Sequence, residues 1–147
     1  MTEQDAKKMT LKDQLCFPLY AAAKETVKRY RPFLEEINLT YTQHIAMLVL
    51  WEHRRLNVKE MGEQLYLDSG TLTPVLKSLK AKGFIRRERS SRDERVLNVE
   101  LTEKGEALRE RAFGVPEQVA CSVRLTEEEI RQLYGLLYKL LDAMEDE

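Results

Sequence analysis

At 147 residues, the chain is long enough for one domain to bury a hydrophobic core without disulfides or metals. Its 24 Lys and Arg nearly balance its 25 Asp and Glu, so the net charge of −1 gives no overall sign of a nucleic-acid or membrane partner. No apolar run reaches the ~18 residues of a membrane span, and the start of the chain lacks the apolar core of a signal peptide. With two cysteines, no C-x-x-C and no ligand cluster around its two histidines, the chain is expected to be cytoplasmic, without a metal or other cofactor.

The first predicted helix contains one of the two cysteines. Thr10 is expected to cap it, with Asp13 in its first turn. Apolar residues recur in steps of three and four at positions 16, 20, 23, 27, 30 and 34, which predicts one long amphipathic helix. Pro18 lacks a backbone donor and is expected to kink or loosen the turn around Cys16. From the residues alone, Cys16 is either a small buried hydrophobe or the centre of the protein's chemistry.

Three further helices are predicted in the middle of the chain. TYTQ at 40–43 is a capping box that opens a helix through HIAMLVLWEH, and NVKE at 57–60 opens a shorter one ending near Leu67. The next helix starts at about Ser69 and stops at Gly83. Its apolar face consists of Leu72, Val75, Leu76 and Leu79.

The pattern then changes from helix to strand and back. Alternating Leu97, Val99 and Leu101 predict a strand, and SSRDE at 90–94 predicts the turn of a hairpin. Thr102 is expected to cap a fifth helix that breaks at FGVPE. The last helix, LTEEEIRQLYGLLYKLLDAM, carries a seam of apolar residues like that of a coiled coil at positions 130, 133, 137, 140 and 144.

Positive charge is concentrated in one segment. Residues 77–95 contain eight Lys or Arg and three acids, a local charge of +5 that leaves −6 for the rest of the chain. Such a run is often only a solvated surface. Here it covers the outer face of a helix and a hairpin, which together predict a winged helix–turn–helix. Its helix would enter the major groove of DNA, and its arginine-rich hairpin would reach phosphates or the minor groove.

Two sets of motifs resemble a known family. The segment LDSGTLTPVLKSLKAKGFIRRERSSRDERVLNVELTEKG resembles the recognition helix and wing of the MarR family of bacterial repressors, and DER followed by LTEKG is its most specific part. DQLCFPLYAA, INLTYTQH and WEHRRLNVKEMGEQLYLDSGTLTP are similar to the organic hydroperoxide resistance regulators within that family. The resemblance implies a mainly α fold with a small β-hairpin wing, in a single domain over 1–147. Dimerisation helices are expected at about 1–36 and 103–147, and the DNA-binding winged helix at about 40–102.

The resemblance also implies roles for individual residues. Asp93 and Arg95 match the wing pair, in which Arg95 enters the minor groove and Asp93 orients the wing. Asp93 could instead be a turn-forming aspartate, or it could have both roles. The recognition-helix positions expected to face DNA are Ser69, Gly70, Thr71, Thr73 and Lys77.

Cys16 matches the reactive cysteine of these sensors. Tyr30 and Tyr41 match tyrosines that bind its sulfur, although both could simply be packing residues. Tyr30 lies ~21 Å from Cys16 along a continuous helix, so the tyrosine that reaches the sulfur would come from a partner chain. Cys121 is either a resolving thiol or inert; without a resolving thiol, the oxidised sulfur would be trapped by a small cellular thiol.

These observations predict a homodimeric repressor and not an enzyme. It would leave an inverted-repeat operator in double-stranded DNA when organic hydroperoxides oxidise Cys16. One alternative is a repressor released by reversible binding of a phenolic ligand. Another is a thiol peroxidase, which would leave the basic segment unexplained.

Overall fold

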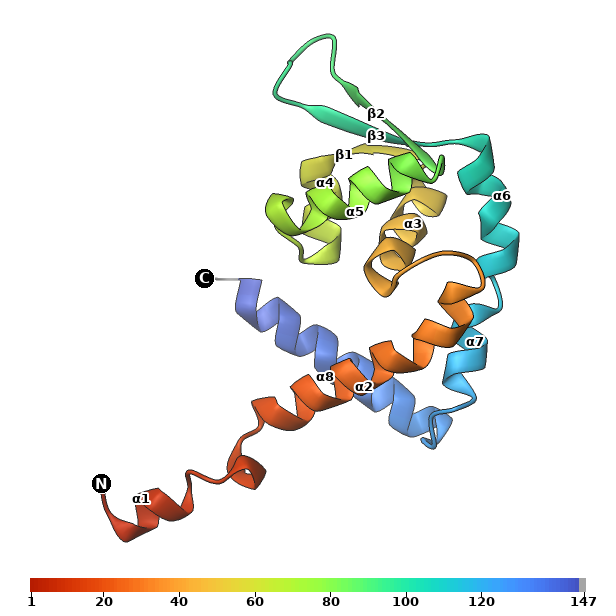
Figure 1. The fold of residues 1–147 in the computed structure, drawn as a ribbon. Helices are drawn as coiled ribbons and strands as arrows, with labels where there is room; N and C mark the ends of the chain where they lie inside the picture. Colours follow the sequence, from red (N-terminus) through yellow and green to blue (C-terminus); the bar gives the residue numbers. More distant parts are fainter. Residues whose placement is uncertain (146–147) are drawn as a thin grey trace. The chain divides into compact units, whose positions relative to one another are not determined.

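The computed structural model describes residues 1–145, and the chain divides into two compact units, Met1–Pro116 and Glu117–Glu147. The first unit begins with α1 (Glu3–Lys7), a short 3-10 turn η1 (Leu11–Asp13), α2 (Cys16–Glu35) and α3 (Tyr41–His53). It continues with β1 (Arg55–Asn57), α4 (Val58–Leu65), α5 (Ser69–Ala81), β2 (Ile85–Arg89), β3 (Leu97–Leu101) and α6 (Glu103–Ala112) (Figure 1). The boundary falls within α7 (Val115–Ala120), and α8 (Glu127–Glu145) follows. Within residues 1–145, no helix combines the length and the apolar character needed to cross a membrane.

The predicted helix starts in the middle of the chain are confirmed. Thr40 and Gln43 form both halves of a capping box at the start of α3. Asn57 caps α4 by accepting a hydrogen bond from the Glu60 amide. These caps satisfy first-turn amides that have no partner within the helix, so they fix where each helix begins.

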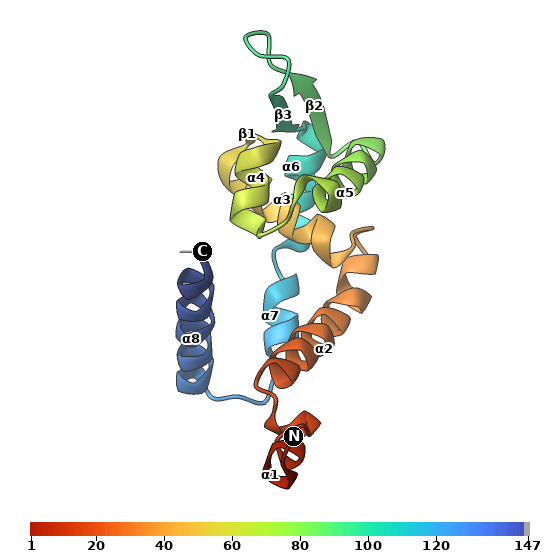
Figure 2. The ribbon, with the colours of Figure 1, turned by 90° about the vertical axis from the view of Figure 1, so that its left-hand side faces the viewer.

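The core lies between α3, α4, α5 and the sheet. Its largest fully buried side chains include Met47, Leu50, Met61, Leu72, Leu76, Leu79 and Val99. Three of these come from the predicted apolar face of α5, which places the opposite, basic face of that helix toward solvent. The β2–β3 turn projects beyond α4 and α5 in both views (Figure 1, Figure 2). The winged helix–turn–helix fold is therefore confirmed.

The wing differs from the prediction by one strand. The sheet is antiparallel, with the order β1-β3-β2, and Val99 pairs with Leu56 on one side and Arg87 on the other. The three residues of β1 are too few to show a period of two, and the strand forms because β3 offers it a free edge. Gly83 adopts a φ of 83° after α5, as expected of a left-handed helix stop.

The prediction for the first helix was wrong in two respects. Thr10 precedes the 3-10 turn η1 and makes no side-chain capping hydrogen bond to the backbone, whereas α2 begins only at Cys16. Pro18 therefore occupies the first turn of α2. Backbone amides in the first turn have no acceptor within the helix, so the missing N–H of proline costs no helical hydrogen bond and Pro18 does not break the helix. α2 runs on to Glu35 without interruption.

The C-terminal prediction is confirmed in outline. Thr102 caps α6 by accepting a hydrogen bond from the Gly105 amide, and the helix ends at Ala112, with Phe113 as its C-cap residue. The chain re-enters a helix at once in α7, which was not predicted. Thr126 and Glu129 form the reciprocal hydrogen bonds of a capping box before α8.

Candidate DNA-binding and thiol sites

The start of α5 is exposed and well anchored. The Asp68 carboxylate accepts a hydrogen bond from the Thr71 amide at 2.7 Å. The hydrogen bond from this amide lowers the pKa of Asp68 below its ordinary value, and the Thr71 hydroxyl has a smaller effect in the same direction. The carboxylate therefore keeps its charge. Among the predicted DNA contacts, Ser69, Gly70, Thr71 and Lys77 are exposed. Thr73 is half-buried, and its hydroxyl donates to the Ser69 carbonyl at 2.6 Å.

The wing tip is ordered by one aspartate. The Asp93 carboxylate accepts a hydrogen bond from the Arg95 amide at 3.0 Å and lies 3.3 Å from the Nε of the same residue. The Val96 amide donates to the Asp93 carbonyl, and the Arg89 guanidinium donates to the Glu94 carbonyl. Asp93 therefore forms the turn and also orients the Arg95 side chain, which is 91% exposed.

Cys16 is the first residue of α2 and is exposed in the single chain. The preceding residue, Leu15, makes no side-chain cap. The amides of the first turn are therefore not occupied by a capping side chain, and the helix end presents partial positive charge beside the sulfur.

Tyr30 and Tyr41 lie together at the other end of α2. Their ring centroids are 5.1 Å apart in an edge-on arrangement. Burial raises the pKa of both phenols, and the neighbouring Tyr30 adds to the effect on Tyr41. Both therefore remain neutral hydroxyl donors at neutral pH. The structure brings the two predicted tyrosines together, and the unbroken α2 separates them from Cys16 of the same chain.

His44 completes an aromatic cluster behind the tyrosines. Its ring centroid lies 6.0 Å from Tyr30, 6.5 Å from Tyr41 and 6.4 Å from Trp51. The side chain is buried, its Nδ1 has no hydrogen-bond partner, and burial lowers its pKa. His44 was not predicted to belong to a site; its i+3 spacing from Tyr41 was the available signal that both share one helix face.

Comparison with known proteins identifies the family. A family model described as transcriptional regulator SarA/Rot matches residues 28–111. The organic hydroperoxide resistance transcriptional regulator of Bacillus subtilis is 48% identical over 136 residues, which cover 92% of each chain. The chain belongs to the MarR-type regulators of organic hydroperoxide resistance. It is a DNA-binding transcriptional regulator.

Solved structures agree with this assignment. Reduced AbfR bound to DNA, a protein of Staphylococcus epidermidis, aligns with a TM-score of 0.76 at 31% identity, covering 95% of this regulator and 98% of that chain. Disulfide-formed AbfR aligns with a TM-score of 0.63 at 30% identity over all of both chains. A mutant of Escherichia coli MarR in complex with operator DNA shares the fold, with a TM-score of 0.74 at 23% identity, covering 86% of this regulator and 93% of that chain.

The second thiol of the regulator, Cys121, directly follows α7. It is exposed, and its amide donates to the Glu117 carbonyl at 3.0 Å. Both cysteines are free thiols in the structure. Cys16 belongs to the first compact unit and Cys121 to the second.

A pocket of about 440 Å³ opens beside Tyr41. It is lined by Val27, Arg31, Leu34, Glu35, Leu39, Thr40, Tyr41 and Thr42. Three aliphatic side chains, Val27, Leu34 and Leu39, give it an apolar wall, and Tyr41 also lines it. A molecule with a hydrocarbon group and a polar end could be accommodated there.

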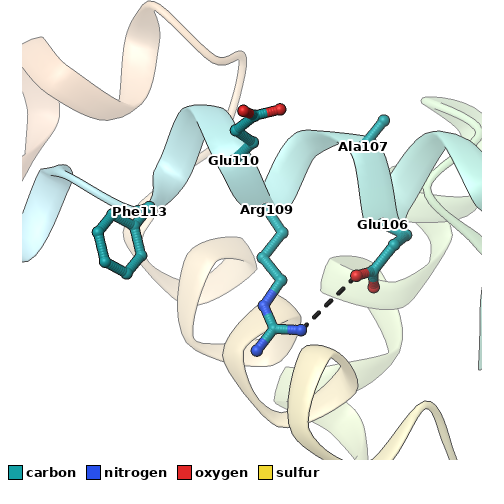
Figure 3. A pocket seen from close by; sticks show the side chains of 5 residues that line it. All are labelled: Glu106, Ala107, Arg109, Glu110 and Phe113. Atoms are coloured by element: carbon teal, nitrogen blue, oxygen red, sulfur yellow. Dashed lines mark ion pairs between the residues drawn. The ribbon is translucent and has the colours of Figure 1, made fainter.

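A second hollow, of about 410 Å³, lies along α6 (Figure 3). Its lining includes an ion pair in which Arg109 Nη1 lies 3.6 Å from Glu106 Oε1, and Phe113, which is 85% exposed. None of the residues predicted to contact DNA or the sulfur lines this hollow. It therefore has no part in the sites described above.

Proposed function

We propose that the regulator is a homodimeric repressor that leaves an inverted-repeat operator when an organic hydroperoxide oxidises Cys16. The observation that carries this proposal is the unbroken α2, with an exposed thiol at its first residue and Tyr30 fourteen residues further on. Fourteen residues of α-helix span ~21 Å, so one chain cannot bring the tyrosine to its own sulfur. An antiparallel partner chain can, and this completes the sensor across the dimer interface.

The oxidation step uses groups that the chain supplies. The Cys16 thiolate attacks the distal oxygen of the hydroperoxide, and the O–O bond breaks. Sulfur loses two electrons and becomes a sulfenic acid, while the departing alkoxide takes a proton and leaves as an alcohol. The hydroxyls of the partner's Tyr30 and the partner's Tyr41 donate to the thiolate before the reaction. The apolar pocket beside Tyr41 favours a hydroperoxide with a hydrocarbon group over hydrogen peroxide.

A second thiol can then condense with the sulfenic acid, which forms a disulfide and releases water. Cys121 of the partner subunit is the resolving thiol in this scheme, and a small cellular thiol is the alternative. The related protein AbfR has a disulfide-formed state, which supports this step. The regulator would act in the cytoplasm, where thiols are reduced until the oxidant arrives.

Oxidation of Cys16 would weaken DNA binding by changing the distance between the two recognition helices of the dimer. One recognition helix per chain binds one half-site, and the half-sites lie about one helical turn, ~34 Å, apart. A sulfenic acid or disulfide is larger than a thiolate and no longer accepts the same hydrogen bonds. A packed interface cannot accommodate that change without movement. A movement of a few ångströms would prevent the second recognition helix from binding its half-site.

The test combines DNA binding with mass spectrometry. A fluorescent duplex is selected from a random pool by the reduced protein, and binding is followed while one equivalent of cumene hydroperoxide per chain is added. We expect release of the duplex, one oxygen or one disulfide at Cys16, and no continued consumption of hydroperoxide. Release without modification of Cys16 would contradict the proposal.

A further inference from the structure

A buried amide connects the recognition helix to the turn that carries Tyr41. Gln43 is 7% exposed, and both ends of its side-chain amide are hydrogen-bonded. Its Nε2 donates to the hydroxyl of Ser78, on α5, at 2.9 Å. Its Oε1 accepts from the Thr40 amide at 3.1 Å, which closes the capping box of α3. One side chain therefore fixes the start of α3 and at the same time contacts the last third of the recognition helix.

Lys82 strengthens the same connection. It is the C-cap residue of α5, and its Nζ donates to Gln43 Oε1 at 2.8 Å and to the Asn38 carbonyl at 2.7 Å. Asn38 lies in the turn between α2 and α3, where its φ is 58°. A hydrogen bond from an ammonium group is stronger than one between neutral groups. Through this one lysine, the C-terminal end of α5 is bound both to the α2–α3 turn, at Asn38, and to the first turn of α3, at Gln43.

The α2–α3 turn is also where the tyrosines meet. Tyr41 directly follows the capping residue Thr40, and its ring contacts Tyr30 of α2. A displacement of the tyrosine pair therefore moves the first turn of α3, whose capping glutamine contacts α5. Gln43 is buried with a hydrogen bond at each end of its amide, so a displacement of α3 relative to α5 that broke either bond would leave a buried polar group unpaired.

We propose that Gln43, together with Lys82, is a positioning residue that couples the state of the tyrosine pair to the position of the recognition helix. The proposal rests on the proposed function, since it presupposes that oxidation of Cys16 disturbs the tyrosines. Gln43 is buried in the chain and is not among the residues expected to contact DNA or the sulfur. Its role is to make the two sites interdependent, so its removal should reduce the coupling between them more than the binding of DNA itself.

Three methionine variants isolate this role. Gln43→Met keeps the approximate length of the side chain and removes every hydrogen bond of the amide, including those to Ser78 and Lys82, while the bond from Lys82 to the Asn38 carbonyl remains. Lys82→Met removes only the lysine's hydrogen bonds and leaves the capping box intact. Lys104→Met is the matched control, because Lys104 Nζ donates to the Lys82 carbonyl at 2.8 Å from α6 and makes no bond to the α2–α3 turn. Both lysine variants lose one positive charge, so any general loss of phosphate attraction is the same in the two.

The measured quantity is the ratio of the Kd of the oxidised protein to that of the reduced protein for the selected duplex, with folding checked by circular dichroism. Coupling between sites typically changes affinity about 5- to 150-fold. We expect the ratio in Gln43→Met to be closer to one than in wild type, lower by about fivefold or more. The ratio in Lys82→Met should be lowered less, and the ratio in Lys104→Met should equal that of wild type.

The outcomes separate the two proposals. A ratio in Gln43→Met and Lys82→Met equal to that of wild type would overturn the coupling role while leaving the proposed function intact. An equal loss in Lys104→Met would also overturn it, because loosening of α5 in general would then be the cause. A wild-type ratio of one would overturn the proposed function and the coupling together. If Gln43→Met does not fold, Lys82→Met against Lys104→Met decides the question.

Discussion

At the scale of single residues, Asp93 and Arg95 show how one turn orients a side chain that is predicted to contact DNA. Asp93 accepts from the Arg95 amide and pairs with its Nε, so the guanidinium is held at the wing tip before DNA arrives. We expect Arg95→Ala to weaken binding to the selected duplex by about 1–3 kcal/mol, because it would remove the contact that Arg95 is predicted to make with the minor groove. Fluorescence anisotropy at fixed salt measures this loss.

The control is Arg131→Ala, which removes an exposed arginine paired with Glu127 on α8. It should leave the affinity for DNA unchanged, and neither variant should lower the melting temperature, since both side chains are exposed. Equal affinity in Arg95→Ala and wild type would mean that the wing does not contact DNA.

His44 supplies a residue-scale prediction about pH. Burial lowers its pKa in the folded protein below 6.5, so the unfolded chain binds the proton more readily. The folded state is therefore most favoured above pH 6.5, and the free energy of unfolding falls as the pH drops below that value toward the folded-state pKa. Urea unfolding at about pH 7.5 and about pH 5.5 measures this decrease in the free energy of unfolding, and the decrease should be smaller in His44→Phe. The control is His53→Asn, at an exposed position, which should show the same decrease in the free energy of unfolding as wild type. If His44→Phe also shows the wild-type decrease, another group is responsible for it.

At the scale of elements, α6 packs so closely that only glycine can occupy position 105. A Cβ there would collide with the Phe84 carbonyl oxygen and lie 2.8 Å from the Leu101 side chain. The Gly105 carbonyl also accepts the Trp51 indole hydrogen bond at 2.9 Å. Gly105→Ala should therefore lower the free energy of unfolding by about 1–3 kcal/mol.

Gly135 in the middle of α8 is the matched control for this prediction. A Cβ at this position meets nothing within 4 Å. Because alanine is the better helix former, Gly135→Ala should be neutral or stabilise the protein by up to about 1 kcal/mol. Urea denaturation of both variants at one protein concentration gives the comparison, and equal destabilisation would show that the close approach at α6 is not the cause.

The elements that could be predicted from the sequence are those determined by nearby residues. The capping box at Thr40 and Gln43 and the apolar face of α5 need only positions three or four apart. β1 exists because β3 offers it an edge, and α2 begins at Cys16 because the preceding residues form a separate turn around Thr10. The predicted tyrosine pair came from family resemblance. The contacts of Gln43 with Ser78 and Lys82, 35 and 39 residues away, depend on the folded core and left no local pattern.

At the scale of the whole molecule, apolar surface left exposed in the single chain indicates a partner. α8 exposes Ile130, Leu133, Leu140 and Met144 along its predicted seam, and α2 exposes Phe17 beside Cys16, next to the exposed Leu15. Surface of this extent at both ends of the chain predicts a dimer. Light scattering at micromolar concentration should give twice the mass of the 17.2 kDa chain. A folded species with the mass of one chain would contradict this and would leave the shared thiol site without its second half.

The central claim is that the sulfur of Cys16 controls the DNA-binding state of the whole dimer, and one measurement tests it most directly. The affinity of Cys16→Ser for the selected duplex is determined before and after one equivalent of cumene hydroperoxide, beside wild type. A hydroxyl keeps the packing of the thiol but is not oxidised, so the variant should bind as tightly as reduced wild type and remain bound after treatment. Wild type should be released, and a reductant should restore its binding unless the sulfur has been over-oxidised. Release of the Cys16→Ser protein by the hydroperoxide would contradict the account.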